Sequence, residues 1–167
     1  MRYLLPLTAI ALCFCATNTM AASDSAQGDA KAKIIAPVTI TESEDMNFGT
    51  MLSSQAHNVT LDHADGRTST VSTMLVDDSA NAPKSGKFVI NNGGTAPVTA
   101  TISLPASTTV SANGTNLTVD TFTSDFPTGS NNIPAGDTDL NVGATLHVTV
   151  NAPAGDYTGQ YTVTISY

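Results

Sequence analysis

One short segment of the chain offers side chains that could hold a metal ion. It reads Leu-Asp-His-Ala-Asp-Gly, so Asp62, His63 and Asp65 place two carboxylates and an imidazole close together. Carboxylate oxygens next to a glycine are also features of calcium-binding loops. The segment lacks the further acidic residues and the closing glutamate of such a loop. We therefore interpret Asp65-Gly66 as a polar hairpin turn and expect neither a bound metal nor a cofactor.

Groups that could catalyse hydrolysis are scattered along the chain. Asp77 and Asp78 form a carboxylate pair, but adjacent strand residues point to opposite faces, whereas catalytic carboxylates converge from separate segments. His147 lies between threonines, where we expect it to be solvated. The sequence has no Gly-x-Ser-x-Gly elbow, and Asn92-Gly93-Gly94 lacks the lysine of a phosphate-binding loop. These observations argue against an enzyme.

The last segment of the chain has the clearest alternation of apolar and polar residues. Such a period of two predicts a strand with one buried face. The candidate assembly strand comprises Gly155, Tyr157, Tyr161, Val163, Ile165 and Tyr167. A tyrosine stripe of this kind can stack on sugars, but packing at the end of a core is the commoner reason for it.

The first strand is predicted over residues 34–41. Its inward face would carry Ile34, Ala36, Val38 and Ile40. Pro37 cannot donate a hydrogen bond to a neighbouring strand, so we predict an edge strand.

Further strands are predicted at residues 57–61, 68–76, 87–91, 98–104 and 140–150. Asn113-Gly114 predicts a tight hairpin turn between two more. In the second arm, Phe122 is out of phase with Leu117 and Val119, and a bulge near Asp120 or Thr121 would restore its phase. Short strands, frequent turns and little helix predict an all-β fold, a single immunoglobulin-like antiparallel β-sandwich of about eight or nine short strands.

The beginning of the chain has the order of a secretory signal peptide. Arg2 precedes an apolar run from Leu4 to Ala16, and small residues follow at Thr19 and Ala21. We expect residues 1–21 to be cleaved. The apolar run is shorter than the roughly 20 residues that span a bilayer, so we expect no membrane span in the mature protein. The expected location is the periplasm, the cell surface or the extracellular space.

The two cysteines, Cys13 and Cys15, both lie in this leader. The mature protein is therefore expected to depend on its core and its sheets, without disulfides. A polar, flexible extension at residues 22–33 would precede a sandwich domain at residues 34–167. The chain has 6 Lys and Arg residues against 14 Asp and Glu residues, which argues against nucleic acid and anionic membranes as partners.

Several motifs follow one another along the expected mature chain. They are Ala36–Thr41, Met46–Thr50, Gly66–Thr70, Ala100–Pro105, Val119–Phe122, Val142–Leu146 and Pro153–Gly159. In this order they resemble a bacterial family of exported proteins known as domain of unknown function 4402 (DUF4402). The resemblance covers nearly the whole mature chain and implies an exported protein without a known catalytic site.

The end of the chain is also similar to a wider group. Gly155 and Tyr167 bracket an alternating strand, as in pilin-like subunits of chaperone–usher systems, including relatives of spore-coat-U proteins. That resemblance implies that a periplasmic chaperone pairs with an edge of the subunit. The N-terminal extension of the next subunit would later replace the chaperone by strand addition.

These observations predict a non-enzymatic exported structural or adhesive protein, a fimbrial-like surface subunit that associates by β-strand pairing. Its partners would be further copies of itself, a chaperone or an usher. The alternative is a monomeric secreted binding module for a carbohydrate or a protein, with loops such as residues 125–134 making the contacts.

Overall fold

The computed structural model describes residues 23–127 and 129–167. The chain divides into two units, Met1–Lys33 and Ile34–Tyr167. Residues 23–33, the described part of the first unit, are exposed and form neither helix nor strand. The predicted signal peptide at residues 1–21 lies outside the described residues.

The second unit consists of strands with two short 3-10 helices. In chain order the elements are β1 (Val38–Glu44), β2 (His57–Leu61), β3 (Arg67–Ser69), η1 (Ser72–Met74), η2 (Ser79–Asn81), β4 (Gly86–Asn92), β5 (Val98–Ser103), β6 (Ser107–Ala112), β7 (Thr115–Ser124), β8 (Gly129–Ile133), β9 (Gly136–Val148) and β10 (Thr164–Ser166).

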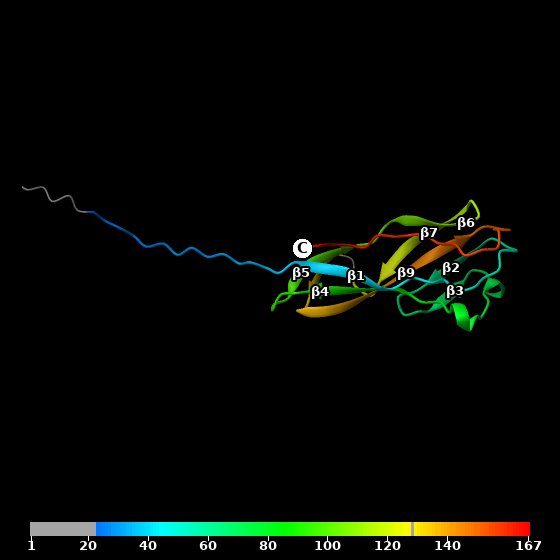
Figure 1. Ribbon diagram of the computed structural model, residues 1–167, viewed down its shortest axis with the longest axis horizontal. Coiled ribbons are helices and arrows are strands. Elements are labelled where there is room, and N and C mark those ends of the chain that lie inside the picture. The colour runs from blue at the N-terminus through cyan, green and yellow to red at the C-terminus, as the bar shows by residue number, and fades with distance from the viewer. Residues whose placement is uncertain (1–22, 128) are drawn as a thin grey trace, which may run out of the picture. The chain divides into compact units, whose positions relative to one another are not determined.

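All strand pairs are antiparallel, and they form two sheets (Figure 1). The larger sheet runs β1-β4-β9-β2-β3, with β7 paired to β9 and β6 paired to β7. The smaller sheet runs β10-β5-β8. The predicted all-β sandwich is confirmed, with ten strands in the described residues rather than eight or nine.

The long strand β9 organises the larger sheet, because it changes partner along its length. Its first half pairs with β4 as far as Val142, and its second half pairs with β2 from Ala144 onward. Gly143 lies between the two halves.

Two apolar clusters lie along the strands. The first cluster joins residues from both sheets, among them Ile90 and Leu140 of the larger sheet and Ile102 and Ile133 of the smaller one. The second cluster comprises Val59, Leu117, Val119, Ala144, Leu146 and Val148. Phe122 packs against both clusters.

The predicted hairpin and bulge are both confirmed. Asn113 and Gly114 have φ angles of 49° and 77°, as a two-residue turn between β6 and β7 requires. The register of β7 on β9 shifts between Asp120 and Thr123, and Thr121 has a φ of 50°. This bulge returns Phe122 to the inner face of the sheet, where it packs on the core.

The first strand is an edge strand, as predicted, but its beginning was predicted too early. β1 starts at Val38, which pairs with Asn92 at the end of β4. The chain turns beyond Asn92, so the residues before Val38 have no strand to pair with. Ile34 is therefore not directed inward: it is 95% exposed. Ala36 is half-buried outside the strand.

Two other segments also differ from the prediction. The strand predicted at residues 68–76 is short, because β3 ends at Ser69 and η1 follows. The loop predicted at residues 125–134 contains β8, which pairs with β5. Its inward residues are Asn131 and Ile133. Because Asn131 is polar, the sequence of this strand does not alternate between apolar and polar residues.

Candidate functional site

A groove of about 1060 Å³ opens over the second apolar cluster. Its floor is formed by Leu117 and Val119 of β7 and by Leu146 and Val148 of β9. Residues 45–53 form its first wall and residues 152–162 its second wall. We call this feature the core groove.

Apart from Ser53 at its end, the first wall makes its backbone hydrogen bonds on its outer side. The backbone N–H of Asn47 donates to the carbonyl of Lys84 at 2.8 Å, and the reverse bond is also 2.8 Å. The N–H of Leu52 donates to the carbonyl of Met74 at 2.8 Å. The wall is thereby attached to the chain that follows β3, on the side away from the groove.

The second wall is attached to β6 in the same way. Thr158 and Ser111 exchange backbone hydrogen bonds of 3.2 and 2.8 Å, and the Thr108 hydroxyl donates to the carbonyl of Gln160 at 2.6 Å. In the described residues, residues 159–162 make no backbone–backbone hydrogen bond, and residues 45–52 make none to residues 152–162. In the described part of the chain the walls join at one end, where the N–H of Asn151 donates to the carbonyl of Ser53 and the Ser53 hydroxyl donates to the carbonyl of Ala152.

The predicted assembly strand forms much of this second wall, but it is not one continuous strand. Only Thr164–Ser166 is regular, as β10 against β5, because the chain leaves β6 after a single bridge at Thr158 and crosses to β5. In Figure 1 this C-terminal run is coloured orange to red and ends beside β5 at the mark C.

The predicted alternation of that segment holds as far as Ile165. Tyr157 and Tyr161 are half-buried and Val163 is buried, and Ile165 packs on the first cluster. Gly155 lines the groove. Tyr167 was predicted to lie on the apolar face, but it is 54% exposed, because it follows the last paired residue of β10.

Tyr161 stands at the junction of the groove and the first cluster. Its ring centroid lies 5.3 Å from that of Phe122 and 5.8 Å from that of Phe88, so the ring is packed between aromatic neighbours. Its hydroxyl is buried and has no hydrogen-bond partner among the described residues. Burial raises the pKa of Tyr161, and the carboxylates of Glu42 and Asp45 raise it further.

The rim of the groove is acidic. Glu42, Asp45 and Asp156 line the groove, and no lysine or arginine of the described chain does. Lys84 and Lys87 are engaged by Glu44, at 3.1 and 2.7 Å. These pairs lower the pKa of Glu44, the hydrogen bond from Lys87 being the largest cause.

The alternation of the C-terminal segment predicted a strand with an apolar face where the second wall lies, and the sequence indicated nothing about the first wall. Met46–Thr50 stood out only as a motif of the resemblance, since it has no regular period. The sequence could not indicate that this motif faces residues 152–162, which are about a hundred positions away.

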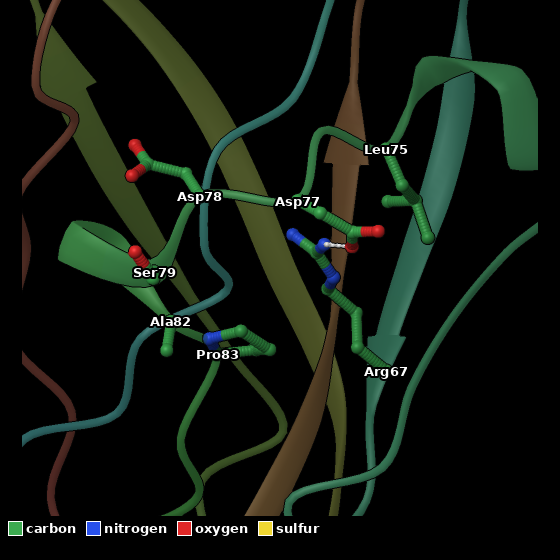
Figure 2. A pocket seen from close by; sticks show the side chains of 7 residues that line it. All are labelled: Arg67, Leu75, Asp77, Asp78, Ser79, Ala82 and Pro83. Carbon is green, nitrogen blue, oxygen red and sulfur yellow. Dashed lines mark ion pairs between the residues drawn. The ribbon is translucent and has the colours of Figure 1, made fainter.

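A second hollow lies beside Arg67, and its other lining residues are Leu75, Asp77, Asp78, Ser79, Ala82 and Pro83 (Figure 2). The Arg67 side chain is only 7% exposed. Its guanidinium donates to the carbonyls of Phe48, Thr50 and Val76 at 3.1–3.2 Å. Asp77 lies 3.8 Å away and is fully exposed, so solvent screens this ion pair. Arg67 is a buried clamp that holds the first wall of the groove.

Replacing Arg67 with alanine should therefore destabilise the protein. Three partly buried carbonyls would lose the guanidinium as a donor, and we expect the free energy of unfolding to fall by about 2–4 kcal/mol. Arg67→Lys should recover only part of the loss, because an ammonium group lacks the planar fork of guanidinium. Chemical denaturation of both variants measures this, with Asp77→Asn as the matched control. If the free energy of unfolding of Arg67→Ala were unchanged, Arg67 would not hold the first wall in place.

The turn interpretation of the Asp62–Gly66 segment is confirmed. The Asp62 carboxylate accepts hydrogen bonds from the N–H groups of Ala64 and Gly66, both at 2.8 Å. Asp65 accepts from the N–H of Ser85 at 2.7 Å, which lowers the pKa of Asp65. Both carboxylates thus hold the backbone in place by accepting hydrogen bonds from its N–H groups. Among the described residues, no group of three or more His, Cys, Asp and Glu side chains is placed to hold a metal ion.

The adjacent carboxylates Asp77 and Asp78 make different contacts. Asp78 accepts from the N–H of Ala80 at the start of η2 and from the Thr50 hydroxyl, both at 3.0 Å. Asp77 points to the Arg67 side chain instead (Figure 2). The two acids serve different contacts and do not converge on a common point.

His147 is more constrained than predicted. It lies on β9 between two strands, with Nε2 donating to the Asp120 carboxylate at 2.8 Å and Nδ1 lying 2.9 Å from Asn58 Oδ1. The hydrogen bond from His147 is the largest cause that lowers the pKa of Asp120, and one from Thr121 adds to it.

The pKa of Asp120 is lower in the folded protein than in the unfolded chain. Asp120 therefore stabilises the fold above its unfolded pKa, and this contribution is lost as the pH falls through its folded pKa. His147→Gln should therefore move the pKa of Asp120 up toward its ordinary value. An NMR titration of the side-chain carboxyl carbons measures this, with the exposed His63→Gln as the control. An unmoved Asp120 titration would contradict the pairing.

No helix in the described part of the chain has the length and apolar character needed to cross a membrane. The comparison with curated proteins gives no match, and neither does the comparison with solved structures. A family model described as domain of unknown function (DUF4402) matches residues 38–167, which include every strand of the sandwich and both walls of the groove. The chain therefore belongs to the DUF4402 family.

Proposed function

We propose that this protein is an exported, non-enzymatic structural or adhesive subunit, fimbrial-like, that associates with further copies by β-strand pairing. The observation that supports this proposal is the pair of groove walls, which are hydrogen-bonded outward and are joined to each other at one end, around Ser53. A backbone edge beside an apolar floor is suited to strand addition, in which main-chain hydrogen bonds give affinity and side-chain pockets give specificity.

A periplasmic chaperone and an outer-membrane usher are the proposed partners in export. Exposed strand edges invite aggregation, and a chaperone that covers the groove until assembly would prevent it. The low content of charged residues, 12%, is compatible with a subunit whose surface becomes covered in a polymer.

The experiment is to express the full precursor in its native host and to run surface extracts on a denaturing gel, boiled and unboiled, with negative-stain microscopy of the same extracts. We expect a heat-sensitive ladder and filaments. A single monomer band without filaments would overturn the proposal.

A monomeric binding module is the second candidate, supported by the volume of the groove. Its volume of about 1060 Å³ is slightly above the range of roughly 300–1,000 Å³ that is usual for small-molecule pockets. Sugar stacking on Tyr161 is disfavoured, because its ring is packed between Phe88 and Phe122. A glycan array at high protein concentration tests this candidate, and the absence of any hit would count against it.

A further inference from the structure

We propose that Asn113 is a site of spontaneous deamidation, and that its conversion to aspartate or isoaspartate loosens the second wall of the core groove from β6. Asn113 lies in the hairpin turn between β6 and β7, and the reaction needs only water. The chemical change takes place within one copy of the chain, so it is independent of strand pairing between copies.

The reaction depends on the residue that follows the asparagine. In Asn113-Gly114, the backbone nitrogen of Gly114 attacks the side-chain carbon Cγ of Asn113, and the absence of a Cβ on glycine leaves that approach open. A bond forms between these two atoms, the bond from Cγ to the amide nitrogen breaks, and the proton lost by Gly114 leaves with that nitrogen as ammonia. Water then opens the succinimide ring at either carbonyl. The product is aspartate, or isoaspartate when the main chain continues through Cγ.

The chain contains the same dipeptide at a second place, Asn92-Gly93, where the fold protects it. Asn92 is 0% exposed, so water does not reach its side chain. Its amide oxygen accepts a hydrogen bond from the N–H of Gly94 at 3.2 Å. Its amide nitrogen donates at 3.0–3.3 Å to three backbone carbonyls, those of Ala96, Ile133 and Pro134. Ring closure at Asn92 would break the hydrogen bonds of a buried group, which has a high cost in free energy.

The Asn113 side chain has far less protection. It is exposed, and in the described part of the chain its amide makes one hydrogen bond, from Nδ2 to the carbonyl of Ala154 at 3.0 Å. The φ angles of Asn113 and Gly114, 49° and 77°, are those of a closed two-residue turn, so the turn must open before the ring can form. A turn at the end of a hairpin opens locally at a small cost in free energy. We therefore expect deamidation at Asn113 that is slower than in a free peptide and much faster than at Asn92.

The hydrogen bond of the Asn113 amide connects the hairpin to the start of the second wall. Its Nδ2 is the donor, and a carboxylate has no hydrogen to donate. After deamidation, a carboxylate oxygen would face the carbonyl oxygen of Ala154 and repel it. The approach is close, because a Cβ added at Gly155 would lie 2.9 Å from Asn113 Nδ2. The wall would therefore separate from the hairpin at residues 154–155.

Isoaspartate has a second effect, on the turn itself. It adds one carbon atom to the main chain, whereas the tight turn accommodates two α-linked residues. The last pair of the hairpin, Ala112 with Thr115, closes directly on this turn. The next attachment of the wall consists of the backbone hydrogen bonds between Ser111 and Thr158, one residue further along β6. We therefore expect both attachments to loosen together, while the buried residues of β7 stay packed.

The first experiment incubates the folded protein, isolated from its native host, in mildly alkaline buffer and maps the products by peptide fragmentation in a mass spectrometer. We expect the mass gain of an amide-to-acid exchange at residue 113, together with labelling by isoaspartyl methyltransferase. Conversion at residue 113 should exceed conversion at residue 92 by about tenfold or more, because an exposed turn opens more often than the core. Equal conversion at the two sites, or none at residue 113, would overturn the deamidation.

The second experiment measures the release of the wall with Asn113→Asp, which has the side chain of one product. Asn116→Asp is the matched control in the same hairpin. Asn116 is also exposed, but its side-chain oxygen accepts a hydrogen bond from the Ser111 hydroxyl at 2.7 Å, so aspartate adds the same charge there and keeps the bond. Aspartate before glycine is compatible with the turn, and circular dichroism verifies that both variants are folded.

Amide hydrogen exchange at Ser111 and Thr158 is the readout, because the N–H of each donates to the carbonyl of the other. We expect Asn113→Asp to accelerate both exchanges about tenfold and Asn116→Asp to leave them unchanged. The N–H groups of β7 that pair with β9 report on the sheet and should exchange at the wild-type rate in both variants. If the two variants exchanged alike at Thr158, Asn113 would not hold the wall, and this part of the proposal would be wrong.

Discussion

Replacing Gly143 with alanine is expected to lower the free energy of unfolding by about 3 kcal/mol or more, since overpacking of a well-packed core has costs of this size. An added Cβ would collide with the carbonyl oxygen of Leu61 and would lie 2.8–2.9 Å from the backbone of Asp62. These are backbone atoms at the end of β2, so no side chain can rotate away to make room. Gly143 lies where β9 passes from β4 to β2, and a shift there would disturb both pairings.

Urea denaturation of the Gly143→Ala variant measures the loss. Gly28→Ala is the matched control, because an added Cβ at Gly28 meets no atom within 4 Å. It should change stability by less than about 0.5 kcal/mol. If Gly143→Ala were as stable as this control, the close approach of β2 to β9 would be wrong.

Local patterns predicted those parts of the fold that local chemistry determines. The bounds of β2, His57–Leu61, agree with the prediction, because apolar residues alternate there and a polar turn follows. The bulge at Thr121 was predictable because a buried aromatic residue must keep its phase with Leu117 and Val119. The hairpin at Asn113 followed from the preference of Asn-Gly for positive φ angles.

Long-range contacts decided the features that the sequence did not indicate. The segment after β3 alternates like a strand, but Arg67 binds its Val76 carbonyl and the carbonyls of the first wall instead. β8 was missed because Asn131 is buried, and its amide donates to the carbonyls of Pro127 and Gly129.

The core groove could be predicted only in part for the same reason. The alternation of the C-terminal segment predicted a strand with an apolar face; the apolar face is present, but only Thr164–Ser166 forms a strand. The opposite wall has no period to detect, since Gly49 adopts a φ of 76° and interrupts the extended chain. The free inner edges of the walls depend on which strands lie beside them, and a single sequence does not contain that information.

Gly159→Ala should have the largest effect on assembly, with a reduction of the heat-sensitive ladder by about tenfold or more, equivalent to about 1.4 kcal/mol. An added Cβ would collide with the carbonyl oxygen of Thr109 and lie 3.1 Å from the Cα atom of Val110. Since both atoms belong to the backbone of β6, the second wall would have to move away from β6 and would narrow or displace the groove. The wall is attached to β6 by few hydrogen bonds, so it can move while the sandwich stays folded.

The contrast between the two glycines separates the roles of the two regions. Gly143 lies inside the larger sheet, so an added methyl group there should destabilise the whole domain. Gly159 lies in an exposed wall, so an added methyl group there should impair assembly while the monomer stays folded. Gel analysis of surface extracts and thermal unfolding of the monomer measure the two effects separately. Thr164→Ala is the control for Gly159→Ala, since Thr164 is exposed in β10 and lies outside the groove lining. A normal ladder from a folded Gly159→Ala protein would mean that copies pair through another edge, of which β1 and β3 are the candidates in the larger sheet.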